Sequence, residues 1–210
     1  EHTGMAVTRV LESIRLTDPQ IKFYQASSSE LFGNSNSSSQ NEQTPFQPRS
    51  PYAIAKLFGY WSTKLYRDGY DMFATNGILF NHESPLRGLE FVTRKISNDV
   101  AKIKLGLSKK INLGNLDGAR DWGYAPEYVE GMWKLMQLKK SDDYILSTDE
   151  THTVREFAEL AFSYVDLKWD KHVKVDKNLY RLLEVNSLKG DSSKTRKAIG
   201  WKPKIKFKKL

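Results

Sequence analysis

The chain of 210 residues contains no cysteine, which excludes a disulfide scaffold, a thiolate metal site and a cysteine nucleophile. It also has no run of eighteen apolar residues, and its N-terminus shows no succession of basic, apolar and small residues. The sequence therefore predicts neither a membrane span nor a secretory signal. We expect a cytoplasmic protein without a membrane partner.

Phosphate-binding glycine turns are also absent. The thirteen glycines form no Gly-x-Gly-x-x-Gly, no Gly-x-x-Gly-x-x-Gly and no Gly-Lys-Ser/Thr loop. A dinucleotide pyrophosphate normally lies on such a turn at a helix N-terminus. Either the protein binds no dinucleotide, or the sequence lacks the first part of a nucleotide-binding domain.

Excess positive charge is confined to the C-terminal end. Thirty-three basic and twenty-five acidic residues give a net charge of +8, yet residues 194–210 alone hold eight basic residues and no acidic one. Because this positive charge is concentrated in a short tail and is not spread over one face of the fold, we expect no nucleic-acid partner. Within this tail, lysines alternate with apolar residues from Lys204 to Lys208, and this alternation indicates a half-buried strand edge.

Helical and extended patterns alternate along the chain, which predicts an α/β fold with a largely parallel sheet. Ser50 and Pro51 are typical of a helix start, and Ile54, Leu57, Phe58, Trp61 and Leu65 mark one face of that helix. Thr153 and Glu156 have the spacing of a capping box. The expected helices are 5–15, from 51 onward, 91–103, 128–136 and 153–164, and the expected strands are 21–26, 73–81, 110–113 and 144–147.

Tyr52 and Lys56 stand four residues apart at the start of a predicted helix, so they share one face. A nearby ammonium lowers the pKa of a phenol and makes it a usable proton acceptor. Tyr60 and Lys64 repeat the spacing, so a simple helical pair with a solvated lysine remains an alternative.

Context favours the first pair. Residues Ser27 to Glu30 directly follow the strand predicted at 21–26. Ligands meet parallel sheets at the carboxyl ends of their strands, so these side chains and Tyr52 are candidates for one acid/base cluster. Turn chemistry or an N-cap is the alternative role for the serines.

Several blocks resemble the extended short-chain dehydrogenase/reductases and, more narrowly, the GDP-mannose 4,6-dehydratase family. They are collinear and occupy residues 25–33, 49–56, 77–88, 91–96, 113–123 and 154–157. The resemblance implies a Rossmann-like, doubly wound, mostly parallel sheet whose first strands are missing, with a smaller C-terminal substrate-binding lobe. Residues 1–85 and 117–150 would form the later part of the NADP-binding domain, and residues 86–116 and 151–210 the sugar-nucleotide-binding lobe.

The resemblance also implies a reaction, the conversion of GDP-mannose to GDP-4-keto-6-deoxymannose by internal hydride transfer through bound NADP and loss of water. Tyr52 would remove the sugar 4-hydroxyl proton, and Lys56 would lower the pKa of Tyr52 and hold the nicotinamide ribose. Glu30 would take the C5 proton and assist the loss of the C6 hydroxyl. Ser28, where the family has threonine, would hydrogen-bond the 4-oxygen.

Further positions follow from the same alignment. His82 and Arg87 resemble cofactor-contacting residues, and the positions that resemble substrate contacts are Asn81, Arg94, Lys95, Arg120, Arg181 and Glu184. A homodimer or homotetramer is implied. The four histidines are scattered, which argues against a metal site.

Departures from the family keep two alternatives open. The glycine fingerprint of the family would lie upstream of Glu1, and residues 179–184 replace the usual Tyr-Arg-Pro-Thr-Glu. One alternative is another sugar-nucleotide epimerase or reductase, although Glu30 argues against a simple 4-epimerase, which needs no C5 base. The other is an inactive truncated lobe with a basic interaction tail.

Overall fold

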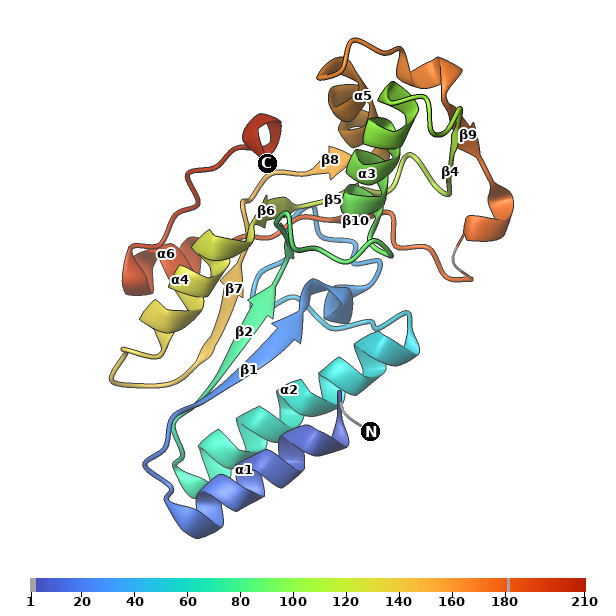
Figure 1. Cartoon of the computed structure of the whole chain (residues 1–210). Helices are drawn as coiled ribbons and strands as arrows, with labels where there is room; N and C mark the ends of the chain where they lie inside the picture. Colours follow the sequence, from blue (N-terminus) through green and yellow to red (C-terminus); the bar gives the residue numbers. More distant parts are fainter. Residues whose placement is uncertain (1–2, 181) are drawn as a thin grey trace.

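The computed structural model describes residues 3–180 and 182–210 (Figure 1). Its central sheet has three parallel strands in the order β1-β2-β7, namely β1 (Phe23–Ser28), β2 (Ala74–Leu79) and β7 (Asp143–Leu146). Every residue of β2 and β7 is buried, as expected for parallel strands covered on both faces. The predicted α/β class with a parallel sheet is confirmed.

Helices cover the two faces of this sheet. α1 (Met5–Thr17) and α2 (Pro51–Tyr70) lie on one face, and α4 (Ala125–Leu135) and α6 (Ser193–Ile199) lie on the other (Figure 1). Successive side chains of a strand point to opposite faces. In β2, Ile78 accordingly packs in a cluster with Tyr60 of α2, whereas Leu79 packs with Tyr128 of α4.

A second group of elements has a core of its own. α3 (Val92–Lys104) and α5 (Val154–Ser163) pack with β4 (Ile111–Leu113), which pairs with β9 (Val173–Val175). The remaining short strands are β3 (Asn81–Glu83) paired with β6 (Trp122–Tyr124), and a small sheet of β10 (Ser187–Leu188), β5 (Ala119–Arg120) and β8 (His152–Thr153). The 3₁₀ helices are η1 (Ser29–Phe32), η2 (Trp169–Lys171), η3 (Lys177–Leu179) and η4 (Phe207–Lys209).

The two helix starts predicted from capping residues are confirmed, whereas α4 begins three residues before the expected position 128. The Ser50 hydroxyl accepts a hydrogen bond from the Ala53 amide, and Pro51 occupies the first turn of α2. Thr153 and Glu156 form the reciprocal capping box of α5. These local signals fix where the two helices begin.

The expected strand edge at Lys204–Lys208 is wrong. No strand forms there, because the amides of Lys204 and Ile205 donate to the Glu127 carboxylate instead of to a neighbouring strand. Part of the basic tail is also neutralised locally, by ion pairs of Lys194, Arg196 and Lys206 with acidic side chains. Within the described ranges, no helix is long and apolar enough to cross a membrane.

Helix α2 leaves most of its predicted apolar face in solvent. Its sheet side is formed by smaller residues such as Ala53, Gly59 and Thr63, which are buried. The opposite side displays a row that we call the α2 stripe, formed by Ile54, Phe58, Trp61 and Leu65, with exposed fractions from 44% to 64%. An exposed apolar row of this size is typical of a contact surface.

Candidate active site

A cleft of about 1100 Å³ opens at the carboxyl ends of β1 and β2. This is the edge at which parallel sheets bind ligands. The cleft brings together seven of the residues predicted from the sequence, namely Ser28, Glu30, Tyr52, Lys56, Asn81, His82 and Arg87.

Local backbone chemistry brings Ser28 and Glu30 to the cleft. Ser28 ends β1 in an extended conformation, and its hydroxyl accepts a hydrogen bond of 3.2 Å from the Glu30 amide, which caps η1. Leu31 is fully buried and anchors the turn. Gly33 then ends η1 with φ +54°, and a Cβ there would lie 1.9 Å from the Gln47 carbonyl oxygen, so this position requires glycine.

Tyr52 and Lys56 come from the first turns of α2, as their spacing predicts. The Lys56 ammonium donates a hydrogen bond of 2.8 Å to the Ala26 carbonyl in β1. It lies 5.8 Å from the centroid of the Tyr52 ring. Burial lowers the pKa of Lys56.

The pKa of Tyr52 differs from the expectation of a lowered value. Burial raises it above the ordinary value of 10, and the Glu30 carboxylate acts in the same direction. A hydrogen bond with Ser28 and the charge of Arg87 lower the pKa, but burial outweighs them. Lys56, whose ammonium donates to the Ala26 carbonyl, is not among the main causes of this shift in the pKa of Tyr52.

His82 presents a neutral imidazole to the cleft. Its Nδ1 lies 2.8 Å from the Phe80 carbonyl oxygen, which can only accept, so Nδ1 carries the proton and Nε2 is an acceptor. The ring also stacks on Tyr128 with centroids 5.0 Å apart. Burial lowers the pKa of His82, which keeps the ring uncharged at neutral pH.

Arg87 is held in place from two sides. Its Nε lies 3.2 Å from the Glu83 carboxylate, and its guanidinium carbon lies 3.5 Å from the centroid of the Phe91 ring. Glu83 is buried and also accepts a hydrogen bond of 2.6 Å from Thr93. A fixed guanidinium at the cleft wall is well suited to a phosphate or carboxylate group.

Four predicted substrate contacts do not belong to the cleft wall. The Lys95 ammonium donates to the Asn112 carbonyl, and Arg120 donates to the Val185 carbonyl, behind the wall that Val185 itself forms. Arg94 is a half-buried residue of α3, and the Glu184 carbonyl accepts a hydrogen bond from Asn34. Arg181, the remaining predicted contact, lies outside the described residues.

Sequence reasoning missed several residues of the wall. Arg49 lines the cleft directly before the cap of α2, and Phe91, Leu182 and Leu183 contribute apolar surface. A basic residue next to a helix cap at the carboxyl edge of a sheet was the available signal for Arg49. Nothing in the local sequence marks the two leucines, because they reach the cleft from a distant segment.

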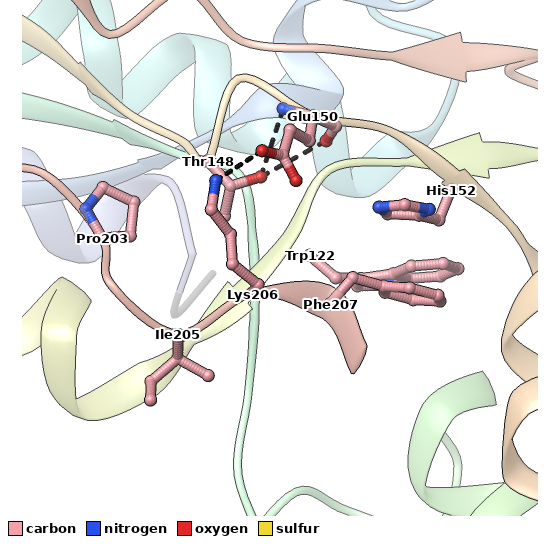
Figure 2. A pocket seen from close by; sticks show the side chains of 8 residues that line it. All are labelled: Trp122, Thr148, Glu150, His152, Pro203, Ile205, Lys206 and Phe207. Carbon is pink, nitrogen blue, oxygen red and sulfur yellow. Dashed lines mark hydrogen bonds and ion pairs between the residues drawn. The ribbon is translucent and has the colours of Figure 1, made fainter. Parts of the chain in front are cut away.

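A second hollow, shown in Figure 2, contains none of the predicted site residues. Phe207 stacks on His152 with ring centroids 3.7 Å apart, and Trp122 lies parallel to Phe207 at 6.1 Å. Lys206 and Glu150 form an ion pair beside them (Figure 2). No group of three acidic or histidine side chains that could hold a metal occurs in the part of the chain that the structure describes.

Comparisons with known proteins agree with this geometry. The family model described as GDP-mannose 4,6 dehydratase matches residues 1–210. GDP-mannose 4,6 dehydratase 1 of Arabidopsis thaliana is 52% identical over 206 residues, which cover 96% of this chain and 57% of that protein. The human GDP-mannose 4,6 dehydratase is 45% identical over 226 residues, with 99% of this chain and 61% of that protein covered. The chain thus spans about three fifths of the length of these relatives.

Solved structures show the same fold at low sequence identity. A dTDP-glucose 4,6-dehydratase from Bacillus anthracis in complex with NAD is 19% identical, with a TM-score of 0.87 over 99% of this chain and 64% of that chain. A structure of RMD from Pseudomonas aeruginosa complexed with NADPH is 20% identical, with a TM-score of 0.89 over 99% of this chain and 69% of that chain. The family model matches the whole sequence, and the fold agrees with it. The chain therefore belongs to the GDP-mannose 4,6-dehydratase family.

Proposed function

We propose that the protein converts GDP-mannose to GDP-4-keto-6-deoxymannose and water, with NADP as the hydride carrier. The observation that carries this proposal is the meeting of Tyr52, Ser28 and Glu30 in one cleft at the carboxyl edge of the sheet. A phenol, a hydroxyl and a carboxylate together provide the proton transfers that such a dehydration needs.

Each of these residues has a defined role in this reaction. Tyr52 accepts the proton of the sugar 4-hydroxyl in its phenolate form, which the charge of Arg87 and the hydrogen bond with Ser28 favour against the effect of burial. Ser28 hydrogen-bonds the 4-oxygen as a ketone forms at C4. Glu30 then removes the C5 proton, which the ketone has made acidic, and protonates the departing C6 hydroxyl so that it leaves as water. A nicotinamide nucleotide held by Lys56, His82 and Arg87 would supply hydride transfer from C4 to C6, so the reaction would be redox-neutral overall. A proton returned to C5, equivalent to the one taken from the 4-hydroxyl, would complete the product.

The described residues fit a nicotinamide nucleotide in two respects. The Nε2 atom of His82 offers an acceptor, and the fixed guanidinium of Arg87 offers positive charge at the cleft wall. Lys56 would hold the nicotinamide ribose. Asn81 would contact the GDP-sugar within the cleft. Beyond the cleft wall, further contacts would come from Arg120, in residues 117–150, and from the proposed sugar-nucleotide lobe of residues 86–116 and 151–210, through Arg94, Lys95, Arg181 and Glu184. The proposed NADP lobe comprises residues 1–85 and 117–150.

We further propose that the protein is a homo-oligomer that pairs through the α2 stripe. The stripe exposes two aromatic and two aliphatic side chains in one row. Aromatic residues are enriched in the buried centres of protein interfaces. Two copies of this row, related by a twofold axis, would cover each other.

The decisive experiment incubates the full-length protein with GDP-mannose and NADP⁺ and follows the product by mass spectrometry. We expect a product lighter by one water that carries a 4-ketone, and no product from Tyr52→Phe. A C4 epimer of unchanged mass would refute the proposal in favour of the epimerase alternative. Local ion pairing of the basic tail argues against the interaction-tail alternative.

A further inference from the structure

The amide of Asn76 bridges three elements of the protein, and the proposed chemistry does not use it. Asn76 lies in β2 and is fully buried. Its Nδ2 donates to the Tyr60 carbonyl of α2 at 3.2 Å and to Asp143 of β7 at 2.9 Å. Its Oδ1 accepts a hydrogen bond of 3.2 Å from the Ser27 hydroxyl in β1. Both donors and the acceptor of the amide are therefore in use.

The Asn76 bridge joins the two elements that carry the proposed catalytic groups. Ser27 lines the cleft and is the neighbour of Ser28 in β1. Tyr60 follows Lys56 by four residues and Tyr52 by eight, which corresponds to about one and two turns of α2. The position of the Tyr52 hydroxyl relative to the end of β1 therefore depends on where this amide holds the helix.

Asp143 fixes the orientation of the bridge. Its carboxylate accepts a hydrogen bond of 2.7 Å from the Tyr60 hydroxyl, and Arg67 lies 3.0 Å from its other oxygen. That second oxygen also accepts from Asn76. A flipped amide would direct its carbonyl oxygen at two acceptors, the Asp143 carboxylate and the Tyr60 carbonyl, and the buried environment makes such a mismatch costly.

We propose that Asn76 is a positioning residue that holds α2 in register with β1, and so sets the placement of Tyr52 against Ser28 and Glu30. Ser27 is the partner through which the bridge reaches the cleft. This inference rests on the proposed function, because the groups that it positions are the proposed acid and base. A misplacement of about 1 Å at a reacting group can cost about 100-fold in rate.

The test uses the full-length protein and three variants assayed with GDP-mannose and NADP⁺. Asn76→Leu removes the whole bridge while keeping a side chain branched at Cγ, and Ser27→Ala removes only its end at the cleft. Thr75→Val is the matched control, since Thr75 is a buried neighbour in β2 whose hydroxyl has no hydrogen-bond partner. Thermal unfolding of each variant shows whether the fold is retained.

We expect kcat to fall about 10- to 100-fold in Asn76→Leu, with KM for GDP-mannose within about twofold of the parent value, and a smaller fall in kcat for Ser27→Ala. The limb of the pH–rate profile that reports Tyr52 should move to higher pH, because the hydrogen bond with Ser28 that lowers the pKa of Tyr52 weakens. A smaller folded fraction would reduce kcat without moving that limb.

Two failures can be told apart. An inactive parent protein would overturn the proposed function. An active parent whose Asn76→Leu and Ser27→Ala variants match Thr75→Val in kcat and in pH profile would overturn the positioning role alone. If Asn76→Leu does not fold, the result for Ser27→Ala decides the question.

Discussion

The ion pair between Arg67 and Asp143 allows a quantitative test of how burial changes the contribution of an ion pair on α2 to the free energy of unfolding. Their side chains are 10% and 11% exposed, and the Arg67 Nη1 lies 3.0 Å from the Asp143 Oδ1. The same helix carries an exposed pair of the same sign pattern, Lys64 and Asp68, with side chains 38% and 54% exposed. Substitution of the basic residue in each pair therefore compares two charges that differ in their access to water. Arg67 also lies 3.5 Å from Asp68, so Asp68 keeps a basic neighbour when Lys64 is replaced.

We expect Arg67→Met to cost about 3–5 kcal/mol of the free energy of unfolding, because it leaves the buried Asp143 carboxylate without its counter-charge. The Ala74 carbonyl also loses the hydrogen bond that Arg67 donates at 3.0 Å. Lys64→Met should cost about 0.3–0.5 kcal/mol, as is usual for exposed helical pairs. For a chain of this length, the melting temperature shifts by about 2–4 °C per kcal/mol.

Urea denaturation monitored by circular dichroism measures both values, at low and at high salt. The cost of Lys64→Met should shrink at high salt, whereas the cost of Arg67→Met should persist, because buried pairs are screened much less. Equal costs for the two substitutions, or equal salt dependence, would refute the argument from burial.

Three further outcomes are expected. Glu30→Gln should stop the proposed reaction after the first hydride transfer, so that absorbance of reduced nicotinamide accumulates on the enzyme; normal turnover would rule out Glu30 as the C5 base. Trp61→Glu should shift the protein from oligomer to monomer in analytical ultracentrifugation, and an unchanged mass would exclude the α2 stripe as the interface. Burial lowers the pKa of His82, so the unfolded chain binds a proton more readily than the folded one; stability should fall as pH drops below about 6.5, and His82→Gln should reduce this loss in urea titrations at several pH values.

Local chemistry in the sequence was sufficient to predict where several elements begin. Ser50 and Pro51, or Thr153 and Glu156, act on the backbone next to them, so the helix starts can be read from a few residues. The rule that ligands bind at the carboxyl ends of parallel strands predicts correctly that Glu30 and Tyr52 share one cleft.

Features that depend on distant segments could not be predicted in this way. The raised pKa of Tyr52 comes from burial in a cleft that also includes residues 79–82 and 182–185. The alternation of lysines and apolar residues at Lys204–Lys208 predicts a strand. The Glu127 carboxylate, however, accepts the hydrogen bonds of backbone amides that a neighbouring strand would otherwise accept. Arg49 was not predicted as a site residue, because its candidate role comes from its position at the wall of the cleft.

Helix α2 is constrained on three sides at once. On its sheet side at Gly59, a Cβ would lie 2.9 Å from the side-chain amide nitrogen of Gln25 and 3.2 Å from the side chain of Val7, so even alanine would require the Gln25 side chain to move. Its first turn presents Tyr52 to the cleft, and Ile54 belongs both to the cleft wall and to the α2 stripe. Attempts to improve the solubility of this protein by replacing exposed apolar residues should therefore avoid this helix, since a polar substitution at Ile54 would change both the wall of the cleft and the α2 stripe. Leu105 and Leu107, which are 73% and 75% exposed and lie in the turn after α3, are safer places for such engineering.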